Sequence, residues 1–410
     1  MTEKIESYIL PNGMTLLGQF VAGVESASFS FLFPGGNALI PDKACGAAVV
    51  LDDWMFRGAG PYNSRQLIDA LDGLGLHRQS GPSAESLSFS ASMEAGNLIR
   101  AIELYAEILL RPRLEEEQFE PGRQLALQSL AALDDDPRQK VSFELYEQFY
   151  PDPLGRPSVG KEQDLRRLQP EQTRQIKSAL FDGSGAILAV AGKMDFNKVC
   201  RRVEDLFAQA PAVKSPPPPL RPALRGYRHI PNEGAQVHIG FMTEVPPLGS
   251  PAYYQILAAV SILSGGMSSR LFTEVREKRG LCYAVGARYH SHRQIAGISG
   301  YAGTTPDKAQ QTLEVTLGEF RRLCRGIAQD ELDRAKVGLK SSLIMKNEST
   351  SARAGHLASD RFYLNRVRPL EEIRDSIESL TVQSVQEFLS GCGFEEFTLV
   401  SIGPKPLEVK

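Results

Sequence analysis

Two side chains seven positions apart, Arg276 and Tyr283, could together hold a carbonyl oxygen. Arginine stays charged and presents several N–H donors, and a tyrosine near neutral pH keeps its proton and donates one hydrogen bond. Between them, Lys278 and Arg279 favour the C-terminus of a helix, and Gly280 suits a left-handed cap. A strand is predicted after this cap, so Arg276 and Tyr283 can meet across one turn.

The residues on either side of this pair suggest a strand and an open turn. Leu281, Tyr283 and Val285 alternate along the sequence and are expected to share one face of the strand. Gly265 and Gly266 carry no side chains, so a turn at this point would let an extended peptide approach the backbone closely. The segment is therefore predicted to contain an open turn, a helix with a left-handed cap and a strand.

A purely structural role for the pair stays open on spacing alone. Arg276 could form an ion pair with Glu274 or Glu277, and Tyr283 could be a half-buried strand residue. Surface arginines and aromatic strand residues are both common in globular proteins.

A second segment, Gly46–Gly58, is typical of an apolar buried helix that carries two acids, Asp52 and Asp53. Adjacent helical side chains diverge by about a third of a turn, so these two acids cannot both converge with Val49 one turn earlier. Val49 has no lone pair to offer a metal ion. Without further context, two acids on a helix are most often solvated surface residues.

Together these segments resemble the pitrilysin/insulysin family of metallopeptidases, especially its branch similar to mitochondrial processing peptidases. Ser264–Val285 closely resembles the family's second-domain signature GGMSSRLF…VREKxGLxYxV. Asp152–Pro157 is similar to the family's H-P-L-G-R-P turn. The resemblance implies that Arg276 and Tyr283 bind the substrate and stabilise the transition state, and that Gly265-Gly266 lies along the bound peptide.

The zinc motif of that family, H-x-x-E-H, is degenerate in this chain. Val49, Asp52 and Asp53 occupy its three positions. The family's further glutamate ligand falls at Gln128 or Ser129. A catalytic zinc needs three protein ligands and an open position, so no metal or other cofactor is expected in this chain.

Some members of the family divide the two half-sites between two chains, one with H-x-x-E-H and one with the Arg/Tyr pair. The resemblance therefore implies a catalytically incomplete subunit, active only with a zinc-bearing homologous partner in a heterodimer that hydrolyses peptides. Zinc is expected in that partner. A non-catalytic subunit, either a scaffold protein of a larger complex or a homodimeric peptide-binding protein, stays open as the alternative.

The elements that position these residues are predicted to form two domains, since 410 residues exceed the usual size of one core. Alternating strands at 27–33 and 86–93, with long helices after them, favour an α+β fold. We expect two homologous domains, 1–210 and 225–410, each a mostly antiparallel sheet with helices packed on one face. A proline-rich linker, 211–224, would join them.

The two homologous halves are suggested by segments that recur at nearly one offset. Ile187–Gly192 is echoed 211 positions later by Thr398–Gly403, and Leu127–Leu130 is echoed 213 positions later by Lys340–Leu343. Self-similarity at a fixed period indicates a duplication. Two unrelated domains of similar class are the alternative.

Composition excludes other classes of protein. Lys and Arg number 46 against 49 Asp and Glu, a net charge of −3 that argues against binding to nucleic acid. No apolar run reaches the ~18 residues of a membrane span, and no secretion signal is visible. Five scattered cysteines without CxxC spacing suit a reducing compartment. A cytoplasmic protein is therefore expected.

Overall fold

The computed structural model describes residues 4–181, 183–208, 210, 219–392 and 394–409, which form two compact units. The first unit takes in 1–132, 156–220 and 346–367, and the second takes in 133–155, 221–345 and 368–410. Each unit is built mainly from one half of the chain and includes one short segment from the other half. Most of the predicted linker, 211–218 of 211–224, lies outside the described residues.

The first unit contains a six-stranded sheet. Its strand order is β1 (Ile5–Ile9), β2 (Thr15–Phe20), β8 (Ile187–Gly192), β3 (Ser26–Pro34), β7 (Ser86–Glu94) and β6 (His77–Pro82). All neighbouring strands are antiparallel except β2 and β8. The strands β4 (Gly58–Ala59) and β5 (Tyr62–Asn63) pair separately.

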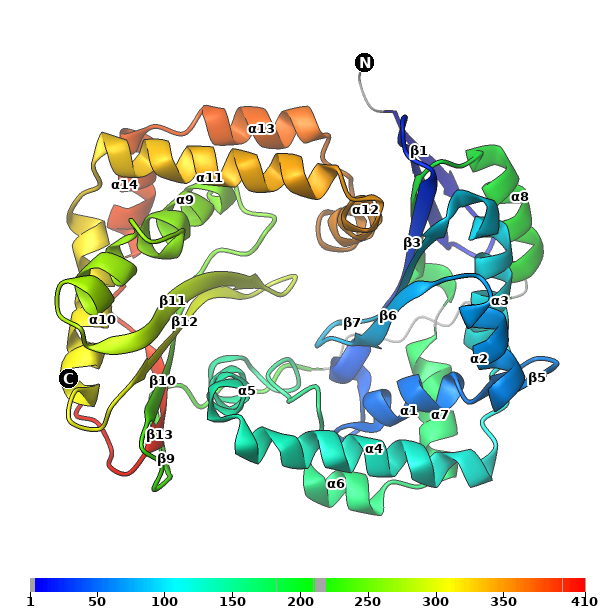
Figure 1. Cartoon of the computed structure of the whole chain (residues 1–410), viewed down its shortest axis with the longest axis horizontal. Helices are drawn as coiled ribbons and strands as arrows, with labels where there is room; N and C mark the ends of the chain where they lie inside the picture. The colour runs from blue at the N-terminus through cyan, green and yellow to red at the C-terminus, as the bar shows by residue number, and fades with distance from the viewer. Residues whose placement is uncertain (1–3, 182, 209, 211–218, 393, 410) are drawn as a thin grey trace. The chain divides into compact units, whose positions relative to one another are not determined.

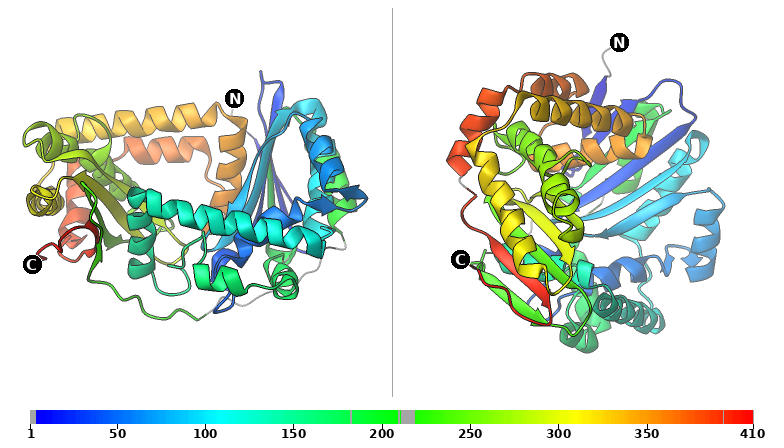
Figure 2. Two further views of the ribbon diagram at one scale, coloured as in Figure 1. Left: turned by 60° about the horizontal axis from the view of Figure 1, so that its bottom comes forward. Right: turned by 60° about the vertical axis from the view of Figure 1, so that its left-hand side comes forward.

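Helices cover both faces of this sheet. They are α1 (Ala47–Met55), α2 (Ser64–Asp72), α3 (Leu98–Leu110), α4 (Phe119–Ala131), α6 (Glu162–Arg167), α7 (Pro170–Leu180), α8 (Phe196–Phe207) and α12 (Thr350–Leu364). Phe29 and Phe31 of β3 alternate as predicted and face the main helical layer, where they contact Tyr105 of α3. Leu32 faces the other way and packs with Leu357 of α12. Figures 1 and 2 show α12 alongside this sheet, opposite α3 and α8.

The second unit contains a five-stranded sheet. Its strand order is β11 (Cys282–Ser291), β12 (Ala296–Thr304), β10 (Val237–Val245), β13 (Thr398–Gly403) and β9 (Tyr227–Pro231). Only β13 and β9 are parallel. This order and these directions repeat those of β6, β7, β3, β8 and β2 in the first sheet. The predicted α+β class is therefore confirmed, and both sheets have the topology expected from a duplication.

The helices of the second unit lie mainly on one face of its sheet (Figure 1). They are α9 (Tyr253–Ser264), α10 (Ala309–Arg325), α11 (Gln329–Asn347), α13 (Leu370–Glu378) and α14 (Val382–Cys392), with a π-helix at Phe272–Glu277. The other face is covered by α5 (Pro137–Phe149), in which Val141 and Leu145 approach Gly240 of β10. Short 3-10 turns lie at Gly36–Leu39, Ala95–Asn97, Glu116–Gln118, Ala132–Asp135 and Gly183–Gly185.

The two segments that echo each other in sequence, Ile187–Gly192 and Thr398–Gly403, are equivalent strands, β8 and β13. Every residue in both strands is buried. A strand that is covered on both faces needs a continuous apolar run instead of alternation. The helices α12 and α5, each contributed by the opposite half of the chain, provide the second cover.

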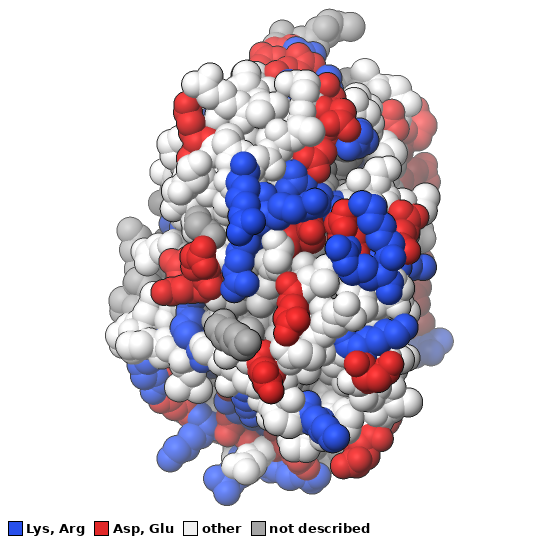
Figure 3. Space-filling view, turned by 90° about the vertical axis from the view of Figure 1, so that its left-hand side faces the viewer, with Lys and Arg blue, Asp and Glu red and all other residues white. Residues whose placement is uncertain are grey.

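Charges of both signs are spread over the surface. On the face shown in Figure 3, Lys and Arg side chains interleave with Asp and Glu, and a short band of basic side chains is bordered by acidic ones. Such a mixed face offers no continuous stripe for nucleic acid. In the part of the chain that the structure describes, none of the helices has both the length and the apolar character needed to cross a membrane.

Candidate functional site

Helix α1 carries the three positions of the degenerate zinc motif, Val49, Asp52 and Asp53. Val49 is half-buried and packs against the core of the first unit. Asp53 forms an ion pair with Arg57, one helical turn further on. Because Val49 has no lone pair and Asp53 is already neutralised, neither side chain is suited to hold zinc.

The Asp52 carboxylate is directed into the unit. Its Oδ2 accepts a hydrogen bond from the hydroxyl of Ser80 on β6 at 3.0 Å. Its Oδ1 is buried and has no hydrogen-bond partner among the described residues. Burial raises the pKa of Asp52 to about 6, while the bond from Ser80 acts in the opposite direction. Asp52 is therefore not the solvated surface acid that spacing alone favoured.

The predicted further ligand position is equally unsuited to a metal. Gln128 and Ser129 are exposed residues of α4. Throughout the described ranges, no group of three His, Cys, Asp or Glu side chains is placed to hold a metal ion. The residues of this chain therefore do not fit the zinc that the resemblance implies for other members of the family.

The predicted helix before Gly280 forms, but residues Phe272–Glu277 adopt π-helical geometry. π-Helical turns are rare and are frequently found at functional sites. Gly280 has a φ of 56° and provides the predicted left-handed cap.

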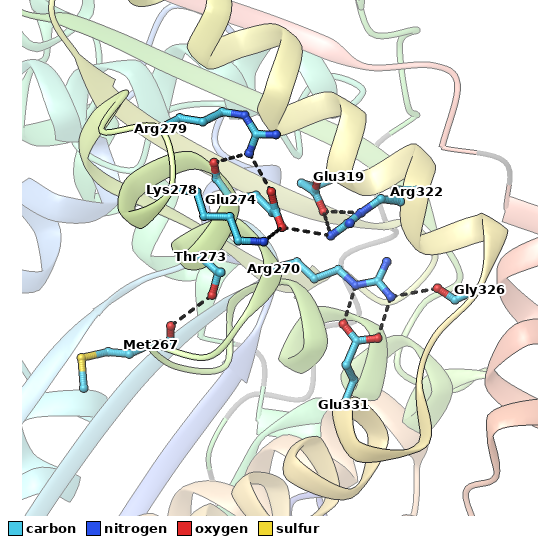
Figure 4. Close-up of polar contacts among 10 residues, drawn as sticks. All are labelled: Met267, Arg270, Thr273, Glu274, Lys278, Arg279, Glu319, Arg322, Gly326 and Glu331. Carbon is cyan, nitrogen blue, oxygen red and sulfur yellow. Dashed lines mark hydrogen bonds and ion pairs between the residues drawn. The ribbon is translucent and has the colours of Figure 1, made fainter.

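A network of ion pairs fixes this π-helix to its surroundings (Figure 4). The largely buried carboxylate of Glu274 accepts hydrogen bonds from Lys278 and Arg279 and lies 3.7 Å from Arg322 of α10. These hydrogen bonds lower the pKa of Glu274 to about 2. The alternative in which Glu274 pairs with Arg276 is therefore wrong, because three other cations surround that carboxylate.

A second ion pair holds the start of the same helix. The guanidinium of Arg270 donates to both carboxylate oxygens of Glu331, at 2.7 and 2.6 Å, and to the carbonyl oxygen of Gly326 at 2.8 Å. Arg270 and Glu331 are both mostly buried. Two-point contacts of this kind fix geometry as well as contributing energy, so the first turn of α11 and the loop before it hold the helix that carries Arg276.

Arg276 itself is exposed, and its guanidinium lies over the ring of Phe272 at 4.9 Å. It makes no ion pair with any acid in the described part of the chain. A guanidinium held by stacking keeps its N–H donors available. The side chain therefore has the charge and the free donors needed to bind an oxygen atom of a ligand.

Tyr283 is positioned by a β-bulge. Cys282 pairs with Thr304 and Ala284 pairs with Gly303, so Tyr283 is the extra residue between them. The prediction that Tyr283 shares a face with Leu281 and Val285 is therefore wrong, because a bulge breaks the alternation of a strand. Its ring is 46% exposed and lies directly over Gly303.

Glycine is required at position 303 by this arrangement. A Cβ atom there would lie 2.4 Å from Cζ and from the hydroxyl oxygen of Tyr283. The sequence Gly300-Tyr301-Ala302-Gly303 contained this signal, because glycines within a strand often mark the close approach of another group. Sequence reasoning missed it.

The hydroxyl of Tyr283 belongs to a short chain of polar groups. It donates to Oε1 of Gln236 at 2.8 Å and lies 3.0 Å from the hydroxyl of Tyr301. The Tyr301 hydroxyl lies in turn 2.8 Å from Nδ1 of His238. Burial lowers the pKa of His238, which favours its neutral form near pH 7. The neighbours Gln236, His238 and Tyr301 were not identified from the sequence.

In the part of the chain that the structure describes, Arg276 and Tyr283 form no hydrogen bond or ring contact with each other, and each has other neighbours. Both have hydrogen-bond donors close to solvent. Gly266 lies before them in an exposed turn where a Cβ would meet nothing within 4 Å, and Gly265 lies where a Cβ would clash with Ser261. The arrangement can therefore bind a peptide carbonyl or an oxyanion at Arg276 and Tyr283, with open backbone at Gly266.

The sequence matches two family models. Residues 23–162 match the model described as insulinase (peptidase family M16), and residues 167–339 match the model described as peptidase M16 inactive domain. An uncharacterized zinc protease of Rickettsia felis is 25% identical over 410 residues, which is 99% of each chain. One of Streptomyces coelicolor is 28% identical over 408 residues, 96% of this chain and 88% of that protein. The crystal structure of a peptidase M16 inactive domain from Pseudomonas fluorescens has the same fold, with a TM-score of 0.89, 19% identity and 99% of each chain covered.

Proposed function

Because the chain belongs to peptidase family M16, we propose that it is a subunit inactive on its own, which supplies Arg276 and Tyr283 to a zinc-bearing homologous partner. The partner would carry the intact H-x-x-E-H motif and the metal. The substrate would be a peptide or a small unfolded protein bound in extended form. The names of the relatives, which are zinc proteases, support peptide-bond hydrolysis as the reaction of the assembled enzyme.

The observation that carries this proposal is the contrast between the two halves of the site. In α1, Val49 offers no lone pair, Asp52 accepts a hydrogen bond from Ser80, and Asp53 is paired with Arg57, so these side chains do not form a set of zinc ligands. In the second unit, Arg276 keeps free donors because Glu274 is neutralised by other cations. The chain has therefore lost one function of the family site and kept the residues of another.

The chemistry expected of the pair is stabilisation of negative charge. The guanidinium of Arg276 would bind the carbonyl oxygen of the scissile peptide and the oxyanion that develops on it. The hydroxyl of Tyr283 would donate a hydrogen bond to the same oxygen or to a neighbouring carbonyl. This hydrogen bond would replace the one that the hydroxyl now donates to Gln236. Donors placed in advance are effective because they need no reorganisation during the reaction.

The test is reconstitution with an H-x-x-E-H subunit from the same source, using a quenched fluorescent peptide and measuring zinc content. The chain alone should contain no stoichiometric zinc and cleave nothing, and the mixture should cleave. Arg276→Ala and Tyr283→Phe should each lower kcat/KM of the mixture by about 10²–10³-fold. Arg374→Ala, on the exposed surface of α13, is the matched control and should leave kcat/KM unchanged.

Two results would contradict the proposal. The isolated chain could bind zinc and cleave, or the mixture could cleave equally well when Arg276 and Tyr283 are both replaced. A stable complex with the partner in which neither variant changes cleavage would favour the alternative, a structural subunit.

A further inference from the structure

A cavity of about 250 Å³ lies within the second unit, between α5 and the face of the sheet formed by β11 and β12. Gly286, which has no side chain, forms part of its floor. Its lining includes Arg138 from α5, Arg288 from β11 and Tyr301 from β12. A water molecule takes up about 30 Å³ in the liquid, so the cavity has room for a peptide side chain and several water molecules.

The guanidinium of Arg138 is held over this cavity by stacking. It lies over the ring of Tyr301 at 5.0 Å from the centroid. No acid in the described part of the chain pairs with it. Because a stacked guanidinium is fixed in plane while its N–H groups stay free, Arg138 is prepared to bind a planar anion.

The second cation, Arg288, is held by a hydrogen bond from one nitrogen of its guanidinium group. Its Nη2 donates to the hydroxyl of Tyr146 at 3.0 Å. That hydroxyl lies 2.7 Å from Nε2 of His290, and burial lowers the pKa of His290 to about 4, so the ring is neutral near pH 7. The neutral ring can accept a hydrogen bond from the hydroxyl of Tyr146, and the oxygen of that hydroxyl can then accept a hydrogen bond from Arg288. The other donors of Arg288 have no acidic partner among the described residues.

The charge of these two arginines is not balanced within the cavity. None of the residues that line it is Asp or Glu. Asp136 lies near Tyr301 but caps α5, where its Oδ1 accepts from the backbone N–H of Gln139 at 3.0 Å. The exposed guanidinium groups of Arg138 and Arg288 therefore line the cavity without an acidic partner, beside serine and tyrosine hydroxyls, and have the chemistry to attract an anion.

The cavity adjoins the substrate-binding residue of the proposed function. Tyr301 lines the cavity, and its hydroxyl lies 3.0 Å from that of Tyr283 on the same face of the sheet. A peptide bound at Tyr283 could therefore place a neighbouring group in the cavity.

We propose that this cavity binds a carboxylate of the peptide substrate, through charged hydrogen bonds from Arg138 and Arg288. The carboxylate comes from an acidic side chain or from the peptide's C-terminus, and both sources share one chemistry. Arginine binds carboxylates in a planar two-point geometry, which gives specificity over an amide of the same shape. The inference rests on the proposed function for the identity of the ligand as a peptide, and assigns that peptide an acidic group.

The test measures binding to the isolated full-length chain, so that it needs neither zinc nor a partner. Fluorescein-labelled short peptides with blocked ends carry one glutamate or one glutamine in an otherwise neutral sequence, and a third peptide has glutamine and a free C-terminal carboxylate. Fluorescence anisotropy at about 0.1 M and 1 M salt gives the dissociation constants. A peptide with a carboxylate should bind about 10- to 100-fold more tightly than the neutral one, as expected for charged hydrogen bonds, and less so at high salt.

Variants of the cavity decide whether this preference arises there. Arg138→Gln and Arg288→Gln should each remove most of it, whereas Arg374→Gln on the surface of α13 should keep it. Ser142→Glu, which places a carboxylate among the lining residues, should abolish it without removing either arginine. Circular dichroism should show that all four variants are folded.

Equal binding of the three peptides, absence of binding by all of them, or a preference that survives Ser142→Glu would overturn the inference. A preference for the free C-terminus alone would identify that carboxylate as the ligand, and a preference for glutamate would identify the side chain. If the peptides bind as predicted but the mixed enzyme cleaves nothing, the proposed function fails while the carboxylate site stands.

Discussion

Replacement of Asp52 by asparagine should remove a loss of stability of the first unit between acid and neutral pH, with a size set by the burial of the carboxyl group. The pKa of Asp52 is about 6 in the folded chain against a reference of 3.8. Between these values the folded state binds a proton that the unfolded state has released, so stability falls as pH rises. The difference, 6 − 3.8 or about 2.2, corresponds at about 1.36 kcal/mol per pKa unit to about 3 kcal/mol.

Asparagine has no charge to lose, so Asp52→Asn escapes this loss. The free energy of unfolding of the variant, relative to the wild type, should rise by about 2 kcal/mol from pH 4 to pH 7, because part of the full difference already lies below pH 4. The amide of the variant is buried where Oδ1 of Asp52 has no hydrogen-bond partner. This change alters the free energy of unfolding by the same amount at every pH and leaves its pH dependence unaffected.

The assay is urea unfolding followed by tryptophan fluorescence. The chain has one tryptophan, Trp54, which is fully buried in α1 two residues from Asp52 and therefore reports on the unit that changes. Linear extrapolation gives the free energy of unfolding at each pH. Asp72→Asn, at an exposed position of α2, is the matched control and should change the free energy by less than about 0.5 kcal/mol. A stability difference between Asp52→Asn and wild type that is the same at pH 4 and pH 7 would refute the reasoning.

Three further predictions concern the second unit. Gly303→Ala should displace the Tyr283 ring and lower kcat/KM of the mixed enzyme by about 10²-fold. The control is Gly318→Ala, where a Cβ meets nothing within 4 Å, and it should leave kcat/KM unchanged. Equal kcat/KM for the two variants would show that the position of the ring is unimportant. Glu274→Gln should destabilise the chain at pH 7 but match the wild type near pH 2, because the depressed pKa of this carboxyl gives stability that is lost as pH falls from 4.5 to about 2; chemical denaturation followed by circular dichroism tests this. His290→Gln should lessen the loss of stability that occurs as pH falls from 6.5 to about 4, because in this range His290 is protonated in the unfolded chain but not in the folded one. Identical dependence of stability on pH for the variant and the wild type, measured by the same method, would contradict this prediction.

Much of the fold was predictable because the hydrophobic patterns of individual strands match the burial of those strands in the structure. The alternation at 27–33 became β3, since its apolar residues face the main helical layer. The apolar run Ile187–Gly192 became a central strand. The sequence offered no sign that α5 and α12 would each cover the sheet of the other unit, because that choice depends on contacts between residues far apart in the chain.

The pair Arg276 and Tyr283 could be named from residue types and motif context, and the loss of the zinc motif followed from side-chain chemistry at Val49. Their surroundings could not be predicted in this way. The three cations around Glu274 come from two helices, and only their arrangement in space leaves Arg276 free.

The sequence by itself determined the class of fold, the residue types at the positions of the family's zinc motif and the two residues proposed to bind substrate. These properties depend on residue identity and on short-range periodicity, both of which can be obtained directly from the sequence. Only the tertiary structure decided that Asp52 is buried, that a bulge directs Tyr283 over Gly303, and that Arg138 and Arg288 share a cavity without an acid. Burial, register and charge balance are properties of neighbours in space, and α5 meets β11 and β12 only after the chain has folded.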